Sequence, residues 1–353
     1  MTTTAARGFD VAGRLHAARG RDRRRAAVVV AALLVATAAL AVLALGLGMV
    51  ALTPAEVLDA LLGRPGAPTF IVLGLRLPRV ALALVVGAAL GLSGALLQAV
   101  ARNPLASPDV VGLTGGASTA AVLAIGAGAT GVSVDAAAFA GALAAAALVF
   151  GLAGRGVTGP RFVVVGVTVA FLAQGVLGYA LTRANLTRAE SAFFWLVGSV
   201  GTAPWSDVAR VTVVLVAAAV ALVLARRPLT LLALDDDTVR AVGGRPTGTR
   251  TAVVVLSSVL AAVAVSVAGP VAFVAFVAGP LGRRLRGTGS APFTAALVGA
   301  VLVLGSDLVA QHVLPLLVGG ALKPPVGLVT GALGAPVLLW LLVRGERRKD
   351  GPA

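Results

Sequence analysis

Long apolar runs alternate with short polar connections along almost the whole chain. A helix needs roughly 20 apolar residues to cross the hydrocarbon core of a bilayer, and most of the runs approach that length. Backbone groups in lipid must be hydrogen-bonded within their own segment, so each run predicts a helix. The runs cover residues 26–48, 78–100, 109–128, 134–153, 161–182, 206–225, 249–268, 270–282, 292–312 and 326–343.

The eighth run is short, and it is separate only because Gly269-Pro270 interrupts a longer apolar stretch from Thr251 to Ala278. Proline ends or kinks a helix because it lacks an N–H and its ring clashes with the preceding turn. We therefore predict ten transmembrane helices, with nine and eleven as the alternatives.

Composition supports a membrane protein over every soluble class. Hydrophobic residues make up 58% of the chain and charged residues 12%, against about 25% charged in an average soluble domain. The mean hydropathy is +0.99. Cysteine is absent, which excludes a disulfide framework and any thiolate metal site or nucleophile. The predicted fold class is an all-α polytopic membrane protein.

The charge distribution predicts the topology. The net charge of +15 would suggest a nucleic-acid partner in a soluble domain, but here the cations cluster between apolar runs. With the N-terminus inside, 22 of the 29 Lys and Arg residues fall on the inner side. Cytoplasmic loops carry this excess, so we predict cytoplasmic termini and no nucleic-acid partner. Arginine is frequent and lysine is rare, which is typical of a GC-rich bacterium. We therefore expect this membrane protein in the inner (plasma) membrane of a bacterium.

Three regions follow from this topology. Residues 1–25 form a basic cytoplasmic tail that is attracted to anionic lipid headgroups. The apolar run after it is too long for a signal peptide, so it is predicted as a retained first span. Residues 26–344 form the transmembrane domain, and residues 345–353 form a cytoplasmic C-terminal tail.

The chain shows no catalytic or metal-binding pattern. It has no GxxxxGK[ST] phosphate loop, and His16 and His312 lack metal-ligand spacing. Asp307 is the only acid well inside a predicted span, so it either couples transport to an ion or is hydrogen-bonded between helices. The acids at span ends are expected to cap helices or to meet headgroups: Asp109, Asp135 and Asp207.

Glycine spacing predicts close helix packing. Gly87 and Gly91 form a GxxxG pattern with Gly94 following, and Gly327 and Gly331 form another in the last span. Small residues let helix axes approach closely, either within one bundle or at a subunit interface.

Two further stretches lie at the inner side. Arg102-Asn-Pro-Leu-Ala-Ser-Pro-Asp109 is predicted as a turn, because Asn103-Pro104 and the second proline push the chain out of helix. Residues 231–243 read LLALDDDTVRAVG, and three successive acids there suit the positive end of a short helix that Gly243 stops. Such a helix is either a solvated turn or a docking element.

The order RLPR, G-x-x-L-x-x-x-G-x-x-x-Q and RNPLASPD resembles the FecCD-type permeases, the membrane subunits of ABC importers for iron–siderophore complexes, haem and cobalamin. Further blocks match in order, including LDDDTVRAVG, GPVAFVAFVAGPLGRRLRG, GSDLVAQ and PVGLVTGALGAPVLLWLL. The resemblance implies a type II ABC importer bundle of ten helices and a dimer of permeases. It also implies separate ATPase subunits inside, where ATP and Mg²⁺ bind, and an extracytoplasmic substrate-binding protein. No cofactor is expected on this chain.

The resemblance assigns roles residue by residue. The segment 231–243 matches the part that docks on the ATPase, with the coupling residues Leu234, Asp235, Asp236, Asp237, Thr238, Arg240 and Gly243. Arg76 and Arg79 match arginines that pair with carboxylates of the binding protein, the alternative being arginines that face headgroups. Residues assigned to the pathway or to structural motifs are Gln98, Asn103, Pro104, Thr168, Gln174 and Asp307.

Three departures from the family pattern affect these assignments. Gly279-Pro280 replaces the usual Pro-His, Gln311 replaces a docking arginine, and Lys323 replaces a glutamate. Lys323 is hypothesised to restore the missing outer cation. Together the departures suggest a diverged copy, such as one half of a heterodimer.

The sequence indicates the transported cargo only through a few residues. The fifth and tenth spans line the family's pathway, so Thr168, Gln174 and Tyr179 are candidate lining residues, or else core polar groups bound to neighbouring helices. The segment from Phe194 through Ser199 favours a ferric siderophore over cobalamin or haem, by resemblance only. An ion-coupled secondary carrier and a scaffold without transport are the competing functions.

Overall fold

The computed structural model describes residues 11–154, 160–201, 204–231, 234–287, 291–318 and 323–346. Every regular element within these ranges is helical. The elements, with η1 and η3 as π-helices and η2 as a 3₁₀ helix, are α1 (Val11–Gly46), α2 (Pro54–Leu61), η1 (Phe70–Arg76), α3 (Leu77–Ala101), η2 (Pro108–Val111), α4 (Leu113–Gly126), α5 (Val132–Ala153), α6 (Pro160–Arg183), α7 (Leu186–Val197), α8 (Trp205–Leu224), α9 (Arg226–Leu231), α10 (Asp236–Ala241), α11 (Pro246–Ala268), α12 (Val274–Arg286), α13 (Pro292–Leu308), η3 (Val309–Val313), α14 (Leu314–Val318) and α15 (Val326–Glu346).

A helix lies in each of the ten predicted spans, so the all-helical membrane fold is confirmed. Seven helices of the described chain are long and apolar enough to cross a bilayer, and α4 and α15 contribute shorter apolar stretches. The eighth span begins at Val274 rather than at residue 270, because Pro270 and the left-handed backbone of Phe273 delay the helix. The sequence did not predict α2, α7, α9 and α14.

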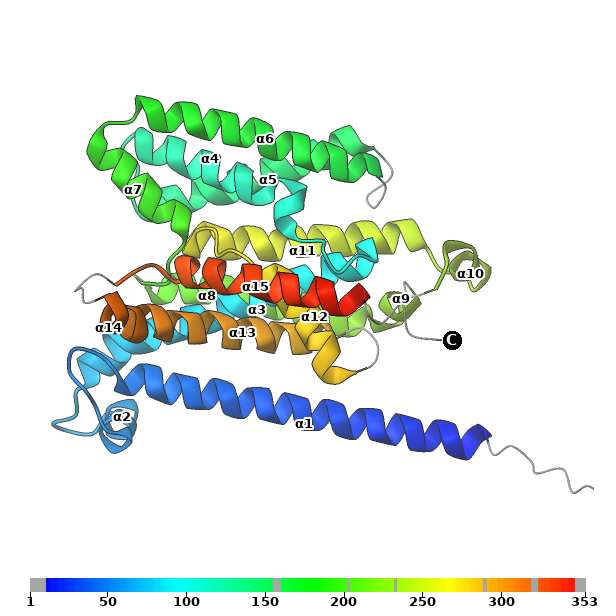
Figure 1. Cartoon of the computed structure of the whole chain (residues 1–353), viewed down its shortest axis with the longest axis horizontal. Helices are drawn as coiled ribbons and strands as arrows, with labels where there is room; N and C mark the ends of the chain where they lie inside the picture. Colours follow the sequence, from blue (N-terminus) through cyan, green and yellow to red (C-terminus); the bar gives the residue numbers. More distant parts are fainter. Residues whose placement is uncertain are drawn as a thin grey trace, which may run out of the picture.

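The long helices run roughly parallel, with α3 at the centre (Figure 1). α3 packs against α8, α11, α12 and α13, and 78% of the apolar window that contains it is buried. By contrast, 6% of the α1 window is buried, and α1 lies along one edge of the bundle (Figure 1). α4, α5 and α6 form a second group that packs on the first mainly through α11.

The two ends of the bundle differ in what they contain (Figure 1). The start of α1, the end of α15 and the short helix α10 lie at one end, called here the α10 end. α2, α14 and the connections after α1 lie at the other, called the α2 end. α1 is helical from Val11, so the helix extends into the predicted tail of residues 1–25.

The glycine pattern of the second span is explained by backbone contacts. A Cβ built on Gly87 would lie 2.4 Å from the carbonyl oxygen of Gly299, and one on Gly94 would lie 1.7 Å from that of Ala275. Neither position can hold a larger side chain unless α12 or α13 moves away. In the last span Gly327 is equally close to Val197, whereas Gly331 has open space around it. Close packing within one bundle is therefore confirmed for Gly87, Gly94 and Gly327.

Gly94→Ala is expected to destabilise the bundle by about 1–3 kcal/mol, because the added methyl group overlaps the α12 backbone. Gly151→Ala on α5 is the matched control, since no atom lies within 4 Å of its built Cβ. Thermal unfolding in detergent measures both variants. Equal melting temperatures for the two would show that α3 and α12 do not approach this closely.

Candidate coupling and docking sites

The segment 231–243 ends in a short capped helix at the α10 end. Asp235 is the N-cap of α10: its carboxylate accepts hydrogen bonds from the Thr238 N–H at 2.9 Å and the Thr238 hydroxyl at 2.8 Å. Val239, a residue of α10 itself, is buried. Gly243 ends it with a φ of +78°, which glycine adopts without strain. The predicted short helix and its stop are confirmed.

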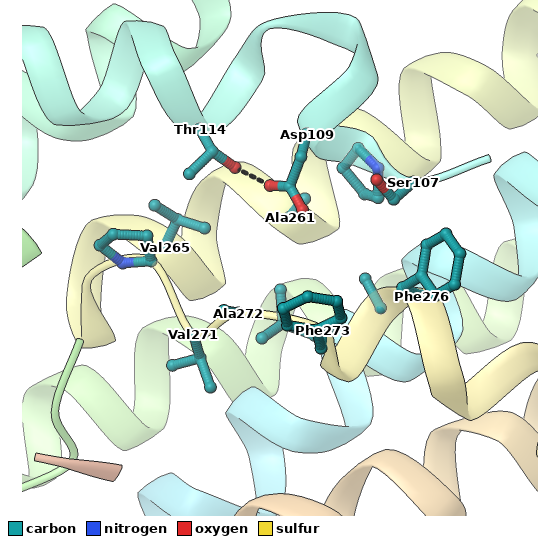
Figure 2. A pocket seen from close by; sticks show the side chains of 13 residues that line it. Ser107, Asp109, Thr114, Ala261, Val265, Val271, Ala272, Phe273 and Phe276 are labelled. Carbon is teal, nitrogen blue, oxygen red and sulfur yellow. Dashed lines mark hydrogen bonds between the residues drawn. The ribbon is translucent and has the colours of Figure 1, made fainter. Parts of the chain in front are cut away.

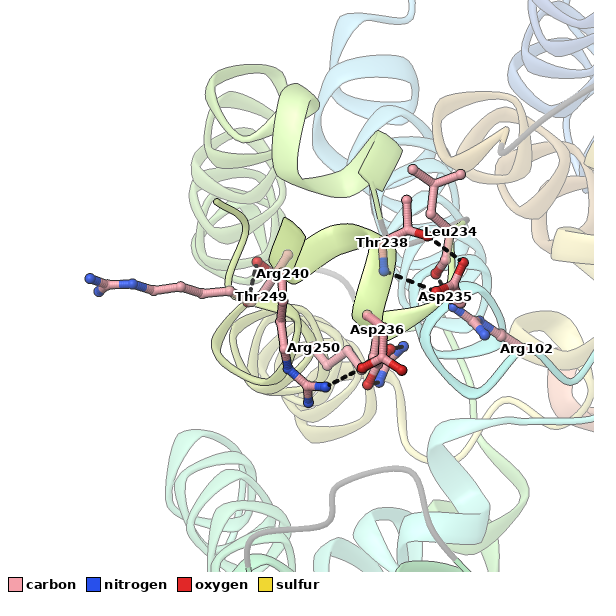
Figure 3. Close-up of polar contacts among 10 residues, drawn as sticks. Arg102, Leu234, Asp235, Asp236, Thr238, Arg240, Thr249 and Arg250 are labelled. Atoms are coloured by element: carbon pink, nitrogen blue, oxygen red, sulfur yellow. Dashed lines mark hydrogen bonds and ion pairs between the residues drawn. The ribbon is translucent and has the colours of Figure 1, made fainter. Parts of the chain in front are cut away.

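Two arginines outside the segment tie it to the transmembrane bundle (Figure 3). Arg250, in the second turn of α11, donates two hydrogen bonds to the Asp236 carboxylate, one of them at 2.8 Å. Arg102, the C-cap of α3, donates to the Leu234 carbonyl oxygen. A forked guanidinium–carboxylate contact fixes orientation as well as charge. The position of α10 is therefore linked directly to α3 and α11.

Both acids that hold the segment are ionised at neutral pH. The backbone N–H of Thr238 lowers the pKa of Asp235, and hydrogen bonding to Arg250 lowers the pKa of Asp236. A lowered pKa means that the contribution of each carboxylate to folding is present above its ordinary pKa and is lost in acid.

Other side chains of the segment point away from the bundle. Asp237 and Arg240 form an ion pair at 2.9 Å, with their side chains 94% and 58% exposed. Leu234 and Val242 are also exposed although they are apolar. These four side chains offer a partner a mixed charged and apolar surface, whereas Asp235 and Asp236 are occupied within the chain.

The three outer cations predicted to dock a binding protein line one cavity at the α2 end, with a volume of about 400 Å³. They are not equivalent. Arg76 donates to the carbonyl oxygens of Leu45, Gly46 and Val50 and so caps the end of α1. Arg79 donates from Nε and Nη2 to both carboxylate oxygens of Asp307, at 2.8 and 2.7 Å. Lys323 is exposed at the rim.

The structure therefore joins Arg79 and Asp307, which the sequence analysis placed in different groups. Asp307 is 8% exposed and Arg79 is 25% exposed, so the pair is largely removed from water. This agrees with the packing alternative for Asp307 in that the carboxylate is held between helices, here by an ion pair.

Gln98 connects α3 to α12. Its Nε2 donates to the carbonyl oxygen of Phe276 at 3.0 Å, and its Oε1 accepts from Arg283 at 3.1 Å. A Cβ on Gly279 would lie 2.1 Å from that Oε1. Glycine at this position leaves room for Gln98, which gives one departure from the family pattern a structural reason.

The remaining predicted residues are not gathered into one site. Asn103 accepts a hydrogen bond from the Leu105 N–H at 2.9 Å, which forms the predicted turn at Asn103-Pro104. Thr168 and Gln174 lie exposed on α6, and the Thr168 hydroxyl bonds its own helix at Val164.

Sequence reasoning missed Arg250 and a cluster at the α2 end. Arg210 on α8 pairs with Asp207 and, at 3.1 Å, with Asp135 on α5. Asp135 therefore joins α5 to α8 through Arg210, and Asp207 pairs with the same arginine within α8, so both carboxylates are held by an arginine rather than by headgroups. A basic residue near the start of α11 was the only sequence signal for Arg250, and nothing linked it to Asp236.

A family model described as the FecCD transport family matches residues 33–344. The chain belongs to this family. It is 40% identical over 314 residues to the achromobactin transport system permease protein CbrC of Dickeya dadantii, covering 87% of this chain and 88% of the relative. It is 35% identical to the ferric enterobactin transport system permease protein FepG of Escherichia coli, covering 86% and 91%.

Two further comparisons extend this family picture. The cobalamin import system permease protein BtuC of Halobacterium salinarum is 35% identical and covers 73% of this chain and 69% of the relative. A solved structure of an inward-facing putative metal-chelate type ABC transporter superposes with a TM-score of 0.78 at 26% identity, covering 90% of this chain and 99% of that one.

These comparisons confirm the resemblance drawn from the motifs. The protein is a multi-pass permease subunit of an ABC importer for iron chelates or cobalamin. It is not an enzyme, because in such importers ATP is bound by a partner ATPase, and a binding protein delivers the cargo.

Proposed function

We propose that this permease imports ferric siderophores and is driven by an ATPase that binds the exposed side of α10. The proposal rests on one observation: the side chains of the segment 231–243 fall into two sets, one bound within the chain and one exposed. Asp235 and Asp236 are held by the chain itself, whereas Leu234, Asp237 and Arg240 are left exposed. A surface of this kind, rigidly attached to α3 and α11, suits a docking element better than a solvated turn.

In the proposed mechanism, α10 moves with the ATPase and passes its movement on to the transmembrane helices. ATP-driven closure of the ATPase displaces the exposed side chains, and the Asp236–Arg250 and Leu234–Arg102 contacts transmit the displacement to α11 and α3. Because α3 is the central helix, its movement shifts α8, α12 and α13 together. Thr238 and Gly243 contribute by holding the two ends of α10.

The pathway is proposed to lie between two permeases. α6 and α15 each leave large apolar side chains exposed in the single chain, including Phe171, Tyr179 and Leu333. Exposed apolar area on two helices fits either lipid or a second permease, and the family supports a homodimer or a heterodimer. Thr168 and Gln174 share the exposed surface of α6 and remain candidate lining residues.

The orientation of the permease in the membrane is inferred from the distribution of its arginines. We place the α10 end in the cytoplasm because the arginines of residues 226–250 and 283–286 lie there. Residues 1–25 and 345–353 are then the cytoplasmic tails of a transmembrane domain that spans 26–344.

The cavity at the α2 end is proposed to receive an acidic side chain of the binding protein. Arg76 and Arg79 already have partners, so Lys323 is the cation most available to a new one. Lys323→Glu is expected to weaken binding-protein affinity about tenfold, because an attractive contact becomes a repulsive one. Arg64→Glu on the exposed Asp59–Arg64 pair is the control. Unchanged affinity for Lys323→Glu would reject this role.

Two relatives of this chain belong to transport systems for achromobactin and for ferric enterobactin, which supports a ferric siderophore as the cargo. Uptake of radiolabelled ferric catecholate, ferric hydroxamate and cobalamin by proteoliposomes that hold the permease, its ATPase and its binding protein tests this assignment. Import of cobalamin alone would favour the second candidate function.

A further inference from the structure

Arginines from two helices that are far apart in the sequence meet at the α10 end of the bundle. Arg25 of α1 donates from Nε to the Leu285 carbonyl oxygen at 2.9 Å and from Nη2 to the Arg284 carbonyl oxygen at 3.2 Å. It thereby caps the last turn of α12, whose carbonyl groups have no partner within the helix. Gly287 follows α12 with a φ of +90° and leaves room for Arg25, because a Cβ there would lie 2.6 Å from Nη1.

The Arg284 side chain is positioned by an aromatic ring. Its guanidinium carbon lies 4.2 Å from the centre of the Trp340 ring of α15, in a cation–π contact. A guanidinium placed over a ring can keep the N–H donors at its edge for another partner. The Arg284 side chain is exposed and forms no hydrogen bond or ion pair with the described part of the chain. These donors are therefore available.

No carboxylate of the described residues pairs with these arginines. Arg21 and Arg24 lie within one turn of Arg25, and both are exposed. Asp22, the acid in that turn, is also exposed and forms no ion pair with the described residues. By contrast, Arg250 at the same end of the bundle holds a carboxylate of the chain itself. We call the unpaired set the α1–α12 cluster: Arg21, Arg24, Arg25 and Arg284. Its positive charge attracts an anionic partner.

One side of α1 continues from the cluster into exposed apolar side chains. Four residues at spacings of three, four and seven fall on this side of the helix: Arg21, Arg24, Val28 and Val35. Val28 is 61% exposed and Val35 is 69% exposed. Because only 6% of the apolar window of α1 is buried, this side faces lipid in the membrane. Basic groups above an exposed apolar stripe match the headgroup and the acyl chains of a phospholipid.

The depth of the cluster also fits a lipid headgroup. Arg24 and Arg25 directly precede the apolar run that begins at residue 26. Tryptophan, here Trp340, is enriched where a membrane meets water. α12 ends short of α10 along the long axis of the bundle (Figure 1). The cluster is therefore closer to the bilayer than the helix proposed to bind the ATPase, which favours a lipid over a protein as its partner.

We propose that the α1–α12 cluster is a binding site for the phosphate of an anionic phospholipid in the cytoplasmic leaflet. The choice of leaflet rests on the proposed orientation, whereas the site itself depends on neither the cargo nor the ATPase. A bound headgroup contacts α1 and α12 together and so holds the peripheral helix α1 to the bundle. Arg283, next to Arg284, bonds Gln98 of α3, so the lipid lies one helix away from the central helix.

Native mass spectrometry of the purified full-length permease in detergent measures lipid binding. Dioleoyl phosphatidylglycerol is the anionic probe, dioleoyl phosphatidylcholine is the zwitterionic probe with the same chains, and inorganic phosphate is added as a competitor. Arg24→Gln with Arg284→Gln removes two charges from the cluster and leaves the Arg25 contacts in place. The control, Arg161→Gln with Arg245→Gln, removes two exposed charges from the α10 end on the other side of the bundle from α1 (Figure 1).

The unmodified chain is expected to bind phosphatidylglycerol at least about tenfold more tightly than phosphatidylcholine. The Arg24→Gln, Arg284→Gln variant should lose about twentyfold in affinity for phosphatidylglycerol, since each arginine near an anionic headgroup contributes roughly a fivefold gain. The control should change by less than about threefold, because salt screens charges that lie farther from the lipid. Arg24→Lys with Arg284→Lys keeps both charges and should retain the affinity to within about threefold.

Four results would overturn the proposal. Equal affinity of the unmodified chain for the two lipids would do so without any variant having to fold. An equal loss in the cluster variant and in the control would show a general attraction to the basic end of the bundle. Displacement of the lipid by inorganic phosphate at the same concentration would show a site for a free anion. Unchanged lipid affinity with lost ATPase co-purification would assign the cluster to the ATPase instead.

Discussion

Arg250→Gln is expected to lower ATP-dependent uptake at least about tenfold, which corresponds to roughly 1.4 kcal/mol of lost coupling. The Arg250 side chain is 14% exposed and Asp236 is 34% exposed, and the pair holds α10 against α11. Without the guanidinium, α10 keeps its own N-cap but is attached to the bundle mainly through Arg102. The measurement is uptake per ATP hydrolysed by the reconstituted importer.

The variant should still fold, because the Asp236 carboxylate that it leaves unpaired is 34% exposed and can be solvated by water. ATPase co-purification should also persist, since the exposed side chains of α10 are unchanged. Arg245→Gln is the matched control: Arg245 is exposed at the start of α11 and forms no ion pair in the described chain. If Arg250→Gln transports normally, the movement of α10 does not pass through this contact.

Asp307→Ala should have the largest effect on stability, a loss of about 3–5 kcal/mol. It leaves the Arg79 guanidinium without its carboxylate in a setting where Arg79 is 25% exposed, and it removes hydrogen bonds of 2.7 and 2.8 Å. Thermal unfolding of the purified permease in detergent measures the loss.

A second ion pair of the same residue types provides the control. Asp59 and Arg64 pair at the α2 end with side chains 39% and 61% exposed, so Asp59→Ala should cost less than about 1 kcal/mol. The double variant Arg79→Leu with Asp307→Leu should be more stable than Asp307→Ala, because it leaves no unpaired charge. Similar unfolding temperatures for Asp307→Ala and Asp59→Ala would contradict the buried ion pair.

Local sequence signals predicted the features that depend on neighbouring residues. Apolar runs located the ten spans, three acids followed by a glycine located α10, and Gly269-Pro270 located the break before α12. The glycines of α3 indicated close contacts, although the sequence did not identify α12 and α13 as the partners.

Features that depend on tertiary contacts could not be predicted from the sequence. Arg79 and Asp307 are 228 residues apart, and no local pattern shows that they pair. Arg250 lies 14 residues beyond Asp236, across a loop whose course sets the contact. Asp109 was predicted to cap a helix or to meet headgroups, whereas it lines a cavity together with residues of α3, α11 and α12 (Figure 2), and hydropathy does not reveal such contacts.

The central claim is that this permease has no power source of its own and is moved through α10. Proteoliposomes that contain the permease, with and without the ATPase, receive the binding protein and radiolabelled ferric chelate on the outside. The account predicts uptake only when the ATPase and Mg-ATP are both present, and no change when ionophores collapse the ion gradients. Uptake by the permease without the ATPase, abolished by ionophores, would contradict it.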